Sequence, residues 1–69
     1  MKKDINMKIT KTEFFNKLDK ISLLDYLTDS NRNMNYFYYK GYKYCLHSEI
    51  VNGKLTEIFY KFRLFKRWH

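Results

Sequence analysis

The first part of the chain spaces its apolar residues with the period of an α-helix, and charged or amide side chains occupy the faces between them. The apolar positions of this segment are Phe14, Phe15, Leu18 and Ile21. Thr10 and Glu13 form a capping-box pattern, in which a hydroxyl and a carboxylate satisfy the first free amides of a helix. The sequence therefore predicts a helix that begins directly after Thr10.

A weaker capping pattern follows at Ser22 and Asp25. It predicts either a second short helix over residues 23–27 or a bent continuation of the first. The polar run 29–33 ends this segment, because its Asp, Ser and Asn side chains compete for backbone hydrogen bonds. Residues 1–9 are mostly polar and predict a flexible N-terminus, which leaves residues 10–69 as a single small domain.

From Met34 onward the pattern changes to that of β-strands. Segments 36–39, 42–51 and 55–65 are rich in aromatic and branched residues, and the dipeptides Lys40-Gly41 and Asn52-Gly53 separate them. Two consecutive hairpins predict a three-stranded antiparallel meander with the second strand in the centre. The fold class is then α+β, with the N-terminal helix packed on one face of the meander and the other face open to water.

The turn at Asn52-Gly53 decides which side chains of the last two strands share a face. A two-residue loop, the usual form for Asn-Gly, sets Leu46 opposite Phe59 and separates the apolar sets of the two strands. A three-residue loop over 51–53, with a bulge at Gly53, unites those sets on one face. Because burial of one face favours the register that unites its apolar residues, the sequence predicts the bulged loop.

The expected core follows from these registers. In the first hairpin, a two-residue Lys40-Gly41 loop pairs Tyr39 with Tyr42 and brings Phe37 to the same face. The expected core positions on the sheet are Phe37, Tyr39, Tyr42, Tyr44, Leu46, Ile50, Ile58, Tyr60, Phe62 and Leu64, covered by Phe14, Phe15, Leu18 and Ile21 of the helix.

The open face is expected to combine aromatic and basic residues. Its predicted members are Tyr36, Tyr38, Lys43, Cys45, His47, Glu49, Leu55, Glu57, Phe59, Lys61, Arg63 and Phe65. In this register Lys43 lies opposite Lys61, a like-charge pair that costs stability unless an anion bridges it. Aromatic rings beside cations suit the stacking of bases and the neutralisation of phosphates. The same composition also fits an aromatic core that is too large to bury, or a protein interface.

The positive charge of the chain is concentrated in its second half, which contains the predicted strands. The 69-residue chain carries a formal net charge of +7. Seven basic and five acidic residues lie in residues 1–34, against seven basic and two acidic residues in 35–69. The predicted binding residues for nucleic acid or another partner are Tyr36, Tyr38, Lys40, Lys43, Phe59, Lys61, Arg63, Lys66 and Arg67.

Composition indicates the source and the compartment. The chain lacks alanine and proline and is rich in residues with A/T-rich codons, which indicates a low-GC bacterium or one of its phages or mobile elements. The same codon bias contributes lysines, so the total charge is weaker evidence than its distribution. Cys45 is the only cysteine, and no apolar run resembles a signal peptide or a membrane helix. We therefore expect a cytoplasmic protein without a membrane partner.

Catalytic and metal-binding patterns are weak. The predicted register sets His47 opposite Glu57, which we interpret as a cross-strand ion pair because no nucleophile accompanies it. Cys45, His47 and His69 are too few and too poorly spaced for zinc. The sequence thus predicts a protein that binds without catalysis, cofactor or metal, although a simple nuclease that uses basic residues and histidine stays open.

Three functions are compatible with these features. The first is binding of nucleic acid, or of the nucleic-acid site of a nucleoprotein machine, through the aromatic and basic sheet face. The second is a phage or mobile-element inhibitor that binds a host defence or replication protein, as anti-CRISPR proteins do. The third is a homodimer in which the open faces pack together. Nucleic-acid binding should weaken steeply with salt, the inhibitor should form a 1:1 complex that resists moderate salt, and the homodimer should have twice the monomer mass in solution.

Overall fold

A computed structural model describes residues 6–64. Its elements, in chain order, are β1 (Met7–Lys8), α1 (Lys11–Leu18), the 3₁₀ helix η1 (Leu23–Asp25), β2 (Leu27–Asp29), the 3₁₀ helix η2 (Ser30–Arg32), β3 (Met34–Tyr39), β4 (Tyr42–Val51) and β5 (Lys54–Arg63). The sheet is antiparallel with the strand order β1-β5-β4-β3-β2. The α+β class is confirmed, but the sheet has five strands where the sequence predicted three.

The helix begins where the capping pattern placed it. Thr10 is the N-cap of α1, and its hydroxyl accepts a hydrogen bond of 3.0 Å from the backbone N–H of Glu13. The Glu13 carboxylate instead accepts a hydrogen bond from the ammonium of Lys61 in β5. Ser22 caps η1 in the same way, by accepting from the backbone N–H of Leu24. The second short helix is therefore present, as a 3₁₀ turn that ends at Asp25.

Two short edge strands were not predicted. β1 lies within the segment expected to be flexible, and it pairs Met7 with Lys61 and Lys8 with Tyr60. β2 pairs Leu27 with Tyr36 and continues to Asp29. Strands of two and three residues are too short to show an alternation of apolar and polar residues, so the sequence pattern does not predict them.

Both hairpins use two-residue loops. Tyr39 pairs with Tyr42 across Lys40-Gly41, as predicted, and Val51 pairs with Lys54 across Asn52-Gly53. The predicted three-residue bulged loop is therefore wrong. Asn52 and Gly53 both have positive φ, at 53° and 78°, which is the backbone of a type I′ turn whose twist matches the flanking strands. The preference of Asn-Gly for a two-residue turn therefore sets the register, although a different register would have gathered the apolar side chains of β4 and β5 on one face.

In this register the side chains of β5 lie on the opposite faces of the sheet from those predicted. Leu46 lies opposite Phe59 and Tyr44 opposite Lys61, so Phe59 and Lys61 face α1. The buried centre on this side consists of Phe14, Phe37, Tyr44 and Leu46, and Ile9, Leu18, Ile21, Tyr26, Tyr39, Tyr42 and Phe59 pack around it. Ile58, Tyr60 and Phe62, expected in that core, lie on the opposite face because their partners are His47, Cys45 and Lys43.

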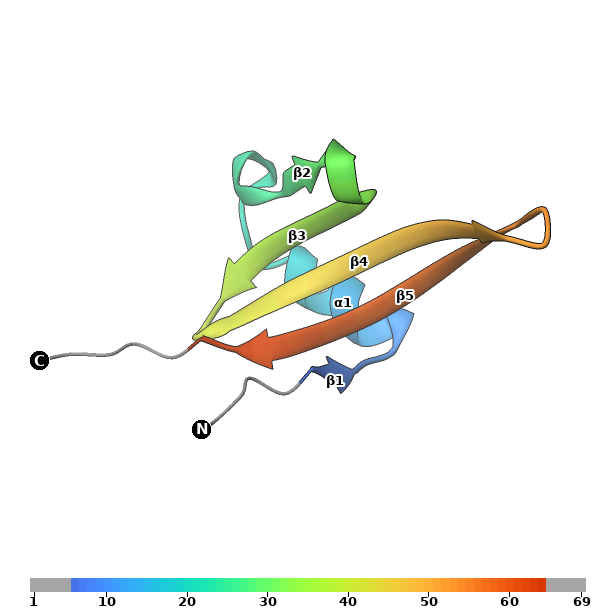
Figure 1. The fold of residues 1–69 in the computed structure, drawn as a ribbon. Coiled ribbons are helices and arrows are strands. Elements are labelled where there is room, and N and C mark those ends of the chain that lie inside the picture. Colours follow the sequence, from blue (N-terminus) through green and yellow to red (C-terminus); the bar gives the residue numbers. More distant parts are fainter. Residues whose placement is uncertain (1–5, 65–69) are drawn as a thin grey trace, which may run out of the picture.

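The side chains at the end of the long hairpin also depart from the predicted core. β4 and β5 extend past the other strands and past α1, which lies behind the sheet (Figure 1). Ile50, expected in the core, belongs to this projecting part and is 68% exposed. Phe15 of the helix, also expected in the core, is 39% exposed, and its ring contacts those of Phe14 and Phe59.

Candidate nucleic-acid interface

The ammonium group of Lys43 lies among three aromatic rings on the face of the sheet opposite α1. Its Nζ is 4.4 Å from the ring centre of Tyr36, 5.7 Å from that of Phe62 and 5.9 Å from that of Tyr38. The rings of Tyr36 and Tyr38 meet edge to face at 5.9 Å. These four residues are called the Lys43 cluster below.

The register explains why the cluster forms. Tyr38, Lys43 and Phe62 are direct cross-strand partners on β3, β4 and β5, and such partners share a face. Tyr36 lies two residues before Tyr38 on the same face. Tyr38 is 48% exposed, so an aromatic surface remains accessible beside the cation. Within residues 6–64 Lys43 forms no ion pair, which leaves its charge for an external anion.

The structure unites only part of the predicted site. Tyr36, Tyr38 and Lys43 lie together on the open face, whereas Phe59, Lys61 and Arg63 lie on the side of α1. Lys43 faces Phe62, so the predicted Lys43–Lys61 pair is wrong. Lys66 and Arg67 lie outside the described residues. Phe62 is the member that the sequence analysis missed, because the bulged register had assigned it to the core.

The displaced basic residues remain at the same end of the sheet. Lys61 lies over the ring of Tyr42 at 4.8 Å, and the Arg63 guanidinium lies over that ring at 6.0 Å. Lys40, in the turn between β3 and β4, lies over Tyr39 at 5.6 Å. Each cation therefore rests against an aromatic ring, an attraction that strengthens as the pair loses water. The hydrogen bond to Glu13 raises the pKa of Lys61 and keeps it charged.

Charge is polarised along the long hairpin. Lys43 is near the start of β4, and Lys61 and Arg63 are at the end of β5, which lies beside it. Glu49 and Glu57 lie toward the other end of the same two strands. The sheet therefore has a basic aromatic end near Lys40 and a projecting end that contains acidic residues. Lys54 also lies at the projecting end, so positive charge is concentrated at the end near Lys40 but is not confined to it.

Beside the Lys43 cluster, the open face has a buried floor. The phenol of Tyr60 reaches across β4 and donates a hydrogen bond to the sulfur of Met34, at 3.6 Å. Cys45, which lies opposite Tyr60 on β4, is fully buried. Burial raises the pKa of the Cys45 thiol and of the Tyr60 phenol, so both stay neutral and fix the platform without adding charge.

The predicted pairing of His47 with Glu57 is wrong. His47 lies opposite Ile58, and its Nε2 is 3.7 Å from the carboxylate of Glu49 on its own strand. Glu57 lies opposite Ser48 on the other face. Among residues 6–64, no three His, Cys, Asp or Glu side chains come together to hold a metal ion.

No family model, curated protein or solved structure matches this chain. No helix in the described part of the chain is long and apolar enough to cross a membrane.

Proposed function

We propose that this protein binds nucleic acid without catalysis, through the Lys43 cluster and the basic residues at the same end of the sheet. The observation that carries the proposal is the position of Lys43, which has aromatic rings around it and no carboxylate partner among the described residues. The partner is a nucleic acid, free or within a nucleoprotein machine of a low-GC bacterium or its phage.

Two kinds of contact act together in this proposal. An exposed base stacks on the ring of Tyr38 or Phe62, an interaction worth about 1–3 kcal/mol for each base. The adjacent phosphates meet Lys43, and those that continue around the end of the sheet meet Lys40 and Arg63. Affinity then falls with salt, because each neutralised phosphate releases condensed counterions.

The deciding experiment is fluorescence anisotropy with labelled single- and double-stranded DNA and RNA, at about 50 and about 200 mM salt. We expect binding that weakens steeply between the two salt concentrations. Tyr38→Ala removes a stacking surface and Lys43→Gln removes a phosphate contact, so both lower the affinity. Lys54→Gln is the matched control, since Lys54 is on the same face but at the far end of the hairpin. Absence of binding at the lower salt concentration contradicts the proposal.

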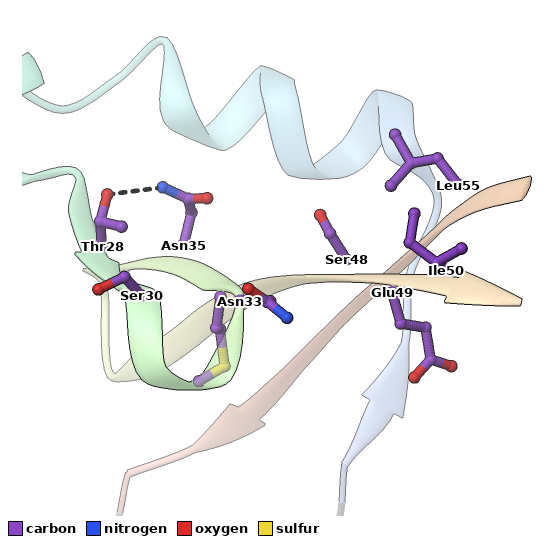
Figure 2. Close-up of a pocket in the computed structure, with 9 residues that line it drawn as sticks. Thr28, Ser30, Asn33, Asn35, Ser48, Glu49, Ile50 and Leu55 are labelled. Carbon is purple, nitrogen blue, oxygen red and sulfur yellow. Dashed lines mark hydrogen bonds between the residues drawn. The ribbon is translucent and has the colours of Figure 1, made fainter. Parts of the chain in front are cut away.

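A second function is favoured by a different observation. The projecting end of the hairpin exposes a cross-strand apolar pair, Ile50 at 68% and Leu55 at 64%, with Val51 beside it. An open groove of about 410 Å³ adjoins this pair (Figure 2). Its lining is Thr28, Ser30, Asn33, Met34, Asn35, Ser48, Glu49, Ile50 and Leu55. Exposed apolar surface rimmed by polar groups is typical of protein interfaces, as an inhibitor of a host protein requires.

The two functions predict opposite responses. A protein inhibitor that docks at the hairpin end forms a 1:1 complex that resists moderate salt and is weakened by Ile50→Asp. Binding at the Lys43 cluster is sensitive to salt and unaffected by that substitution. A homodimer through the open faces doubles the mass in light scattering, and Tyr38→Ala then restores the monomer.

A further inference from the structure

A second hollow lies on the same open face, near the edge of the sheet. It has a volume of about 360 Å³ and is lined by Asn6, Lys8, His47, Ile58 and Tyr60. These residues come from β1 and the residue before it, from β5 and from β4, so the hollow spans three neighbouring strands. We call it the Lys8 groove.

The pairing of β1 with β5 is what creates this groove. Lys8 is the direct partner of Tyr60, and Ile58 is the direct partner of His47, so their side chains share the open face. Lys8 is exposed and, within residues 6–64, forms no ion pair. An edge strand too short to be predicted thus brings a cation to the side of the sheet that holds the Lys43 cluster.

The polar groups of the groove are mainly donors suited to an anionic oxygen. Lys8 provides an ammonium, Asn6 an amide and His47 an imidazole, and the phenol of Tyr60 is already engaged with Met34. The carboxylate of Glu49 lies 3.7 Å from Nε2 of His47, and within residues 6–64 no carboxylate pairs with Lys8. Lys8 is therefore the main charge available to a phosphate, and Ile58 and Tyr60 offer apolar surface to a sugar or a base.

The groove and the Lys43 cluster are close enough for one strand to occupy both. His47 lies four residues beyond Lys43 on β4, about 13 Å at about 3.3 Å per residue. Tyr60 lies two residues from Phe62, so aromatic surface continues between the two places. A duplex keeps its bases paired and presents phosphates outward, whereas a single strand can lay bases on rings and phosphates beside cations.

We propose that the Lys8 groove holds a phosphate of a single-stranded nucleic acid whose bases stack on the Lys43 cluster. This inference rests on the proposed function and adds to it the strandedness of the partner and a second contact point. It makes the open face a continuous track from Tyr38 to Lys8, with the neutral floor of Met34 and Cys45 beneath it.

The test compares Lys8→Gln, Lys43→Gln and the control Lys54→Gln by anisotropy with a single-stranded oligonucleotide of about 16 nucleotides. Gln keeps the backbone pairing of β1 while it removes the charge, and circular dichroism confirms that each variant folds. We expect Lys8→Gln to weaken binding about tenfold at about 50 mM salt and to lower the salt slope by about 1. We also expect the double variant to lose the product of the two single losses, because the contacts are separate.

The outcomes separate this inference from the proposed function. If Lys43→Gln weakens binding while Lys8→Gln behaves like Lys54→Gln, the groove is not a contact and the proposed function stands. If wild-type protein binds duplex more tightly than single strands, the single-strand assignment is overturned. If the wild type binds no nucleic acid at about 50 mM salt, the proposed function fails, and the inference fails with it.

Discussion

Nζ of Lys61 lies 3.0 Å from Oε2 of Glu13, which joins the last strand of the sheet to the first turn of the helix. The two residues are 48 positions apart in the sequence. The contact allows a lysine to occupy the face on which the aromatic core lies, because its ammonium meets a carboxylate and also lies over the rings of Tyr42 and Tyr44. It therefore supports the register that assembles the Lys43 cluster on the other face.

Removal of the Glu13 charge is expected to weaken the fold modestly. Glu13→Gln preserves the size of the side chain and leaves Lys61 without its anionic partner. Because both side chains retain some solvent contact, the expected loss is about 0.5–1 kcal/mol in the free energy of unfolding. Urea denaturation measures it, with Glu57→Gln as the control, since Glu57 is exposed and forms no ion pair within residues 6–64. Equal stability of the two variants contradicts this role for the pair.

Phe59 and Phe62 are expected to differ in what they support. The ring of Phe59 lies 5.3 Å from that of Phe14 and 6.0 Å from that of Phe15, so Phe59→Leu breaks two aromatic contacts on the helix side. We expect it to cost about 1–2 kcal/mol of stability. Phe62→Leu should cost less stability and should weaken nucleic-acid binding. Urea denaturation and anisotropy on both variants measure the difference, and the reverse order of stabilities is the result that the bulged register predicts.

The fold class was predictable because its main elements carry strong local signals. The cap at Thr10, the aromatic strands and the dipeptides Lys40-Gly41 and Asn52-Gly53 each act within a few residues of the chain. The edge strands were not predictable in this way. Met7 and Lys8 become a strand because β5 offers them a free edge, and that is a property of the assembled sheet.

The prediction of the register between β4 and β5 was wrong for a related reason. The prediction assumed that one face of the sheet is buried and the other is wet. In the structure both faces bury side chains, Phe37 and Tyr44 on one and Cys45 and Met34 on the other. Apolar residues of β5 on the open face therefore carry little penalty, and the turn geometry of Asn52-Gly53 decides the register. The face predicted for Tyr36, Tyr38 and Lys43 on β3 and β4 was consequently confirmed, whereas Phe59, Lys61 and Arg63 on β5 lie on the opposite face from the one predicted.

Stability is expected to fall in alkaline solution. Burial raises the pKa of Cys45, Tyr26, Tyr44 and Tyr60, and the hydrogen bond to Glu13 raises that of Lys61. In each case the folded state holds its proton more tightly than the unfolded chain. The stabilisation is therefore complete below the ordinary pKa values, which begin at 9.0 for the thiol, and is lost as the pH rises through the raised values.

Urea denaturation at pH values of about 8 and about 10 measures this loss, which amounts to about 1.4 kcal/mol per pH unit for each proton by which the two states differ. Cys45→Ala removes the group with the lowest ordinary pKa among the five. In that variant the decline should begin nearer 10.0, the ordinary value of the tyrosines. An unchanged urea midpoint at the two pH values excludes this linkage.

The thiol of Cys45 is expected to be unreactive in the folded protein. It is fully buried, and burial raises its pKa, so the reactive thiolate is scarce and inaccessible. A thiol reagent should label the native protein only as fast as it opens and should label the urea-unfolded chain at once. Tyr60→Ala should speed native labelling, because the phenol that spans from β5 to Met34 is removed. Rapid labelling of native wild-type protein would contradict the burial of Cys45.

The position of a basic residue along the hairpin should decide its effect on binding. Lys40 and Arg63 lie at the end that carries the Lys43 cluster, whereas Lys54 lies at the turn of the projecting end, and all three are exposed. Replacement of each by Gln changes the net charge equally. If only the total charge matters, the three variants lose affinity for single-stranded DNA to the same extent. If the basic aromatic end is the contact surface, Lys40→Gln and Arg63→Gln each lower the salt slope by about 1 while Lys54→Gln leaves it unchanged. Anisotropy titrations over a series of salt concentrations distinguish the two cases, because only a residue that directly neutralises a phosphate releases counterions and so contributes to the salt slope.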